Sequence, residues 1–96
     1  TDIWVIKMDR VQSDISEVLE KKELFDIFRN KCILITGATG LIGSMLIKVL
    51  HEANMKYNLS TQIIGHIRNL EKARNIYGNL MNAYDIQFLL QHQNFL

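Results

Sequence analysis

The chain has 96 residues, of which 48% are hydrophobic, and its 11 basic and 10 acidic side chains give a formal net charge of +1. This balance indicates neither a nucleic-acid partner nor an acidic membrane surface. The single cysteine, Cys32, excludes an internal disulfide and a thiolate metal site. Since the sequence shows neither a signal segment nor an apolar run of about 18 residues, we expect a cytoplasmic chain without a membrane partner.

Residues 1–30 are expected to form an N-terminal arm and a helix. Thr1–Arg10 is apolar in its first half, which predicts either an edge strand or a segment that packs on another part of a longer protein. Val11–Asn30 has apolar residues at three- and four-residue steps, and Ser13 can cap its start, so this segment predicts an amphipathic helix. We expect the helix to pack on the rest of the chain rather than to bind a partner. Its apolar face comprises Ile15, Val18, Leu19, Phe25 and Phe28.

The stretch C-I-L-I-T-G-A-T-G-L-I-G, residues 32–43, organises the rest of the chain. Cys32–Ile35 is short and rich in β-branched residues, which predicts a strand buried on both faces, with Cys32 as a small buried side chain. Thr36–Gly40 is small and glycine-rich, which predicts a tight turn, and helical periodicity begins at Leu41. A strand, a glycine turn and a helix in this order are typical of the start of a dinucleotide-binding βαβ unit.

Three glycines in this stretch follow a G-x-x-G-x-x-G spacing. Gly37 can adopt the positive φ that the turn needs, Gly40 lets a pyrophosphate approach the backbone, and Gly43 lets the helix pack closely on the strand. The helix start offers unpaired N–H groups to phosphates, and Thr36 and Thr39 add hydroxyls at the rim. Because alanine would meet a packing need more cheaply, we expect the three glycines to serve a ligand.

The motif T-G-A-T-G-L-I-G resembles the fingerprint of extended short-chain dehydrogenase/reductases, the NAD-dependent epimerase/dehydratase branch. The resemblance covers residues 31–91 and implies an α/β fold. This fold would be a Rossmann-like parallel sheet with flanking helices, present as its first βαβαβ half in residues 31–96, with an extra N-terminal helix before it. It also implies that the chain binds NADP or NAD. The implied cofactor-binding residues are Gly37, Thr39, Gly40, Leu41, Ile42, Gly43, Arg68 and Asn69.

The segments after the glycine turn alternate between helical and strand patterns. The predicted helices are Leu41–Asn54 and Leu70–Ala83, and the predicted strands are Thr61–Arg68 and Ile86–Leu90. His51 and Glu52 are expected to be solvated, and His66 is expected to be a half-buried or core histidine.

The carboxyl end of the predicted strand Thr61–Arg68 bears on the choice of cofactor. An acidic residue there would bind the ribose hydroxyls of NAD, but this sequence has Arg68 and Asn69. Arg68 can pair with a 2′-phosphate, which favours NADP, or it can be an ordinary solvated side chain. The family usually has an Asp just after the strand that corresponds to Ile86–Leu90. This sequence has residues 91–94, Q-H-Q-N, at that place.

The catalytic half of the family pattern is missing. Members use a Tyr-x-x-x-Lys pair, but Tyr57, Tyr77 and Tyr84 are each followed four residues later by another residue type. We therefore predict no catalytic residue and no metal site in this chain. The expected function is that of the N-terminal NAD(P)-binding part of a nucleotide-sugar epimerase/dehydratase or a related reductase, inactive alone.

Two other functions remain open. A non-catalytic module that senses NADP would use the same turn, and an interaction domain would use only the fold. A P-loop is set aside because no Gly-Lys-Ser/Thr follows the turn. An unpaired sheet edge and exposed apolar faces would favour self-association.

Overall fold

The computed structural model describes residues 3–7 and 22–91. Its strands are β1 (Ile3–Lys7), β2 (Cys32–Thr36), β3 (Gln62–Ile67) and β4 (Ile86–Leu90). Its helices are α2 (Lys22–Phe25), α3 (Leu41–Tyr57) and α4 (Leu70–Tyr77), with 3-10 turns η2 (Asp26–Phe28) and η3 (Gly78–Asn82). Within these residues no helix is long and apolar enough to cross a membrane.

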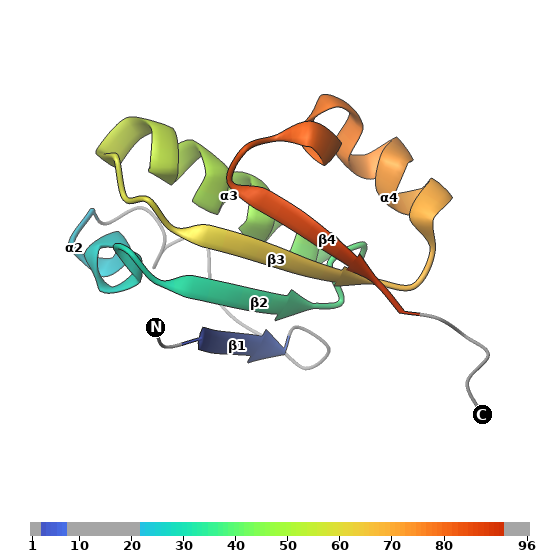
Figure 1. Cartoon of the computed structure of the whole chain (residues 1–96), viewed down its shortest axis with the longest axis horizontal. Helices are drawn as coiled ribbons and strands as arrows, with labels where there is room; N and C mark the ends of the chain where they lie inside the picture. Colours follow the sequence, from blue (N-terminus) through green and yellow to red (C-terminus); the bar gives the residue numbers. More distant parts are fainter. Residues whose placement is uncertain (1–2, 8–21, 92–96) are drawn as a thin grey trace.

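The four strands form one parallel sheet in the order β1-β2-β3-β4 (Figure 1). The predicted α/β class with a parallel sheet and flanking helices is confirmed. Of the two alternatives for the N-terminal arm, the edge strand is the one observed, because Ile3 pairs with Cys32 and Lys7 with Thr36. A strand from residues 1–30 therefore shares a sheet with residues 31–91.

Helices α3 and α4 lie on the same face of the sheet (Figure 1). Parallel neighbouring strands are joined by right-handed crossovers, and here each new strand is added on the same side of the previous one. Successive crossovers in one direction place their helices on one face. The described strands therefore show no reversal of order, which is the feature that creates a crevice in a doubly wound sheet.

The hydrophobic core lies between this helix-covered face and α3. Ile33 and Ile35 of β2 are fully buried, as is Ile63 of β3. They pack with Ile47 and Leu50, which lie one turn apart on α3 and were predicted to face the sheet. Every second side chain of the strands and one face of the helix, which repeats every 3.6 residues, thus form one apolar layer.

The other face of the sheet is only partly covered. Leu34 and Cys32, expected to be buried, are half-buried, so the prediction that β2 is buried on both faces is wrong. On the same face, Val5 of β1 is 53% exposed and Leu89 of β4 is 44% exposed. Described helices α3 and α4 lie on the opposite side, so they cannot cover these side chains.

The boundaries of three predicted helices need correction. The helix predicted over Leu41–Asn54 continues to Tyr57. In the segment predicted as a helix over Val11–Asn30, residues 11–21 lie outside the described residues, and the described helical part comprises α2 and η2 and ends at Phe28. The helix predicted over Leu70–Ala83 ends at Tyr77, because Gly78 has φ +54° and a 3-10 turn follows. His66 of β3 is half-buried, as predicted.

Gly78 generates a prediction about stability. Its φ of +54° and ψ of −124° are accessible to glycine but strained for alanine, although a Cβ there would meet no atom within 4 Å. We expect Gly78→Ala to lower the free energy of unfolding by about 1–2 kcal/mol through backbone strain alone. Urea denaturation measures this, and the exposed neighbour variant Asn79→Ala should change stability by less than about 0.5 kcal/mol. Equal stability of the two variants would contradict the strain argument.

Candidate functional site: the glycine turn

The turn between β2 and α3 lies at the carboxyl end of the sheet. Gly37 has φ +65°, as the sequence predicted, and its carbonyl accepts the Gly40 N–H at 3.0 Å. Gly40 is the N-cap of α3, and its carbonyl accepts the Ser44 N–H at 3.0 Å. The turn is thus closed by its own backbone groups.

The three glycines serve different purposes in this structure. A Cβ on Gly43 would lie 2.1 Å from the Gly37 carbonyl oxygen and 3.3 Å from the Ala38 Cα. The helix therefore packs on the backbone of the turn, and the expectation that alanine could meet this packing need is wrong. Gly40 differs, because its Cβ would come no closer than 3.4 Å to the Gly37 oxygen, and its φ of −78° suits any residue. The fold requires Gly37 and Gly43 but leaves Gly40 free for another purpose.

Several backbone N–H groups at this end of α3 have no acceptor in the described part of the chain. Within the described residues, no hydrogen bond is found for the N–H groups of Thr39, Leu41, Ile42 and Gly43. No side chain caps the helix, and Leu41 is 85% exposed. Unpaired donors at an accessible helix start carry the positive end of the helix dipole. The turn accordingly presents an electropositive backbone surface.

The carboxyl end of β3 lies beside the turn, since the Ala38 N–H donates to the His66 carbonyl at 3.3 Å. The chain then continues into Arg68 and Asn69, as the sequence predicted. Arg68 is exposed, and among the described residues no partner is found for its guanidinium. The Asn69 side-chain oxygen caps α4 by accepting the Lys72 N–H at 3.0 Å, so only its amide N–H groups are available to a ligand.

Tyr77 of α4 supports the turn from inside the protein, a role that the sequence did not reveal. Its hydroxyl donates to the Ala38 carbonyl oxygen at 2.5 Å, and its ring packs on Phe88 of β4 with centroids 4.7 Å apart. In the sequence, Tyr77 falls on the apolar face of a helix, where it is indistinguishable from a core aromatic residue. Its partner Ala38 is 39 residues away.

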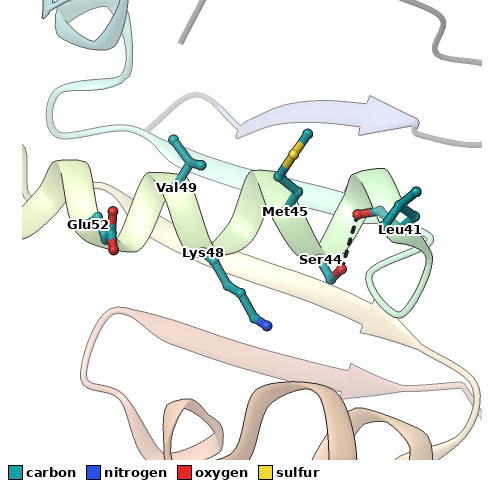
Figure 2. Close-up of a pocket in the computed structure, with 6 residues that line it drawn as sticks. All are labelled: Leu41, Ser44, Met45, Lys48, Val49 and Glu52. Carbon is teal, nitrogen blue, oxygen red and sulfur yellow. Dashed lines mark hydrogen bonds between the residues drawn. The ribbon is translucent and has the colours of Figure 1, made fainter. Parts of the chain in front are cut away.

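A shallow hollow of about 400 Å³ runs along the exposed side of α3 (Figure 2). Met45 and Val49 point to one side of the helix and Lys48 to the other. The Ser44 hydroxyl donates a hydrogen bond to the Leu41 carbonyl oxygen at 3.1 Å. The hollow is mainly apolar and lacks the converging polar groups of a small-molecule site. Its lining residues are Leu41, Ser44, Met45, Lys48, Val49 and Glu52.

A second polar cluster lies near the amino ends of β3 and β4, away from the glycine turn. His51 was expected to be solvated but is mostly buried, and its Nδ1 lies 2.8 Å from Asp85 Oδ1. Asn54 Nδ2 donates to Asp85 Oδ2 at 2.8 Å and to the Thr61 carbonyl at 2.9 Å. A buried carboxylate needs such partners to offset its desolvation. The cluster therefore joins α3 to the starts of two strands, and we interpret it as structural.

The hydrogen-bonding groups gathered at the turn are backbone N–H donors and the buried hydroxyl of Tyr77. Among the described residues, no three His, Cys, Asp or Glu side chains are close enough to hold a metal ion. Burial raises the pKa of Tyr77 above its usual value, so this phenol stays protonated as a donor to Ala38.

The pKa of Tyr77 generates a prediction about alkaline unfolding. Because the folded-state pKa is raised, the folded protein keeps a proton that the unfolded chain releases near pH 10. The contribution of Tyr77 to stability is full below about pH 10 and falls above it, by at most about 1.4 kcal/mol per pH unit. Denaturant unfolding between pH 8 and about 11 should show a shallower decline for Tyr77→Phe than for the unmodified protein. Tyr84→Phe, at a residue 78% exposed, is the control and should keep the original decline; identical profiles for all three proteins would refute the assignment.

Comparisons with known proteins do not assign this chain to a family. No protein-family model, no curated protein and no solved structure matches the chain. The resemblance of the glycine motif to the epimerase/dehydratase branch therefore rests on the motif itself.

Proposed function

We propose that this chain binds the pyrophosphate of NADP or NAD at the glycine turn, as the N-terminal nucleotide-binding part of an epimerase/dehydratase-like protein. The observation that carries the proposal is the row of unpaired N–H groups beside Gly40, a glycine that the fold does not require. A residue without a Cβ costs conformational entropy, so its presence where alanine would fit favours close approach by a ligand.

Electrostatics at the turn suit a phosphate ligand. The start of a helix carries about half a positive elementary charge, and free N–H groups can each donate to a phosphate oxygen. Thr39, Leu41, Ile42 and Gly43 supply such groups within one turn of backbone. A pyrophosphate, with two negative charges and several acceptor oxygens, would satisfy more of these donors than a single carboxylate would.

The position of Arg68 supports a preference for NADP. In a dinucleotide seated on the turn, the adenosine ribose would lie toward the end of the neighbouring strand. That strand is β3, which the Ala38–His66 hydrogen bond holds beside the turn, and Arg68 follows it directly. A guanidinium there can bind a 2′-phosphate with two parallel hydrogen bonds.

The topology is compatible with half of a doubly wound sheet. Strands β2, β3 and β4 with α3 and α4 follow the strand order 3-2-1 of one mononucleotide-binding half. In a doubly wound sheet the fourth strand lies on the free side of the first, and here β1 takes that side of β2. The carboxyl ends of both strands meet at one edge, so a dinucleotide would cross from β3 toward β1.

Catalysis is not part of the proposal for this chain alone. Tyr77 would be an unsuitable base because its hydroxyl is buried and donates to Ala38. The missing Tyr-x-x-x-Lys pair favours a second candidate, a module that senses NADP without turnover. Action on a nucleotide sugar requires residues that this chain does not contain.

Gly40 provides the direct test of binding. Valine is compatible with the backbone at this position, and its side chain would add bulk where the proposed pyrophosphate approaches Gly40. We expect Gly40→Val to weaken NADP binding at least about tenfold, or about 1.4 kcal/mol, in calorimetric titration. Loss of the glycine cap should cost stability only about 1 kcal/mol. Met55→Val, at a residue 66% exposed near the other end of α3, should bind normally; a folded Gly40→Val protein with full affinity would disprove the site.

Cofactor choice is tested at Arg68. A charge-assisted pair with the 2′-phosphate is worth about 1.5–3 kcal/mol, which predicts NADP binding roughly ten- to a hundredfold tighter than NAD binding. Arg68→Ala should remove most of this difference and leave NAD binding nearly unchanged. Arg74→Ala, which removes the same charge from an exposed position on α4, is the matched control. Equal affinities for NADP and NAD in the unmodified protein would contradict the preference.

A further inference from the structure

We infer that Tyr77 is a positioning residue that aims the Thr39 N–H at the ligand by holding the Ala38 carbonyl. This inference rests on the proposed function and adds to it a residue outside the glycine motif. Tyr77 comes from α4, so the turn between β2 and α3 is held by a separate element of the fold.

The geometry of the peptide group carries the argument. In a trans peptide the C=O of one residue and the N–H of the next point in opposite directions across a rigid plane. The described residues contain no cis peptide bond, so the Ala38 C=O and the Thr39 N–H are opposed. Tyr77 is 4% exposed and donates to Ala38 from the interior. The Thr39 N–H must then point away from the interior, and it has no acceptor among the described residues.

Both backbone polar groups of Ala38, its N–H and its carbonyl, form hydrogen bonds. Its N–H donates to the His66 carbonyl at 3.3 Å, and its carbonyl accepts from Tyr77 at 2.5 Å. Glycines on either side of the Ala38–Thr39 pair make the turn intrinsically free to rotate. Two anchors at one residue remove that freedom before a ligand arrives, which lowers the entropic cost of binding.

The ring of Tyr77 also packs on a neighbouring side chain, and this packing can be changed while the hydroxyl of Tyr77 is kept. Its ring contacts Phe88 at a centroid distance of 4.7 Å, and the Lys48 ammonium lies 5.8 Å from the ring centroid. A variant at Phe88 weakens the packing and keeps the hydroxyl. A variant at Tyr77 that removes only the hydroxyl keeps the ring. The pair separates the effect of the hydrogen bond from the effect of stability.

The experiment compares Tyr77→Phe with Phe88→Leu in the full chain. Calorimetric titration with NADP gives affinity, urea unfolding gives stability, and amide hydrogen exchange followed by NMR reports on the ligand-free turn. We expect Tyr77→Phe to bind NADP about tenfold more weakly, which corresponds to about 1.4 kcal/mol. Its Gly40 amide, which donates to Gly37 within the turn, should exchange faster than in the unmodified protein. Phe88→Leu should lose stability but keep its NADP affinity within about twofold.

The outcomes distinguish this inference from the proposed function. If Tyr77→Phe keeps full NADP affinity, or if both variants lose affinity in proportion to their stability, Tyr77 acts through packing and the inference is wrong. If the unmodified protein does not bind NADP, NAD or inorganic pyrophosphate, the proposed function fails and the positioning role fails with it. Slower or unchanged exchange at Gly40 in Tyr77→Phe would also overturn the inference.

Discussion

The contact between the start of α3 and the glycine turn is the constraint on which the rest of the structure depends. At Gly43 the helix approaches the Gly37 carbonyl so closely that a single Cβ would overlap with it. This approach sets where α3 crosses the sheet and hence which side chains reach Ile33 and Ile35. It also lies beside the first N–H groups of the helix, for which no acceptor is found among the described residues. Packing and the proposed binding surface are therefore consequences of one backbone contact.

Much of the fold was predictable because local patterns and tertiary packing agree. β2 and β4 were located from short apolar runs, and α3 from the spacing of Leu46, Ile47 and Leu50. Errors occurred where a single backbone conformation decides a boundary, as at Gly78, because periodicity continues past the point where φ becomes positive. Burial of β2 on both faces was wrong for a different reason. An apolar strand sequence gives the side chains that can be buried, but it does not say whether a second layer covers them.

The parts of the candidate site that the sequence located are two short runs, residues 37–43 and residues 68–69. The motif located Gly37, Gly40 and Gly43, although it could not separate the glycines that the fold needs from the one it does not. Tyr77 and the His51–Asp85 pair were missed because their partners are 39 and 34 residues away in the sequence. A tyrosine or histidine on a helix face has the same local pattern whether it is solvated, packed or hydrogen-bonded. Such contacts follow from the register of the sheet, which the sequence pattern alone does not specify.

The sequential order of the strands has a consequence for how the protein folds during synthesis. Each described strand after β1 pairs with the described strand before it, about 20–30 residues earlier in the chain. The described part of the sheet can therefore grow in one direction as the chain leaves the ribosome. Among the four described strands, none has to wait for a distant partner and none has to be inserted between two others. The first half of a doubly wound sheet follows this same order, and its fourth strand is then added on the opposite side of the first strand.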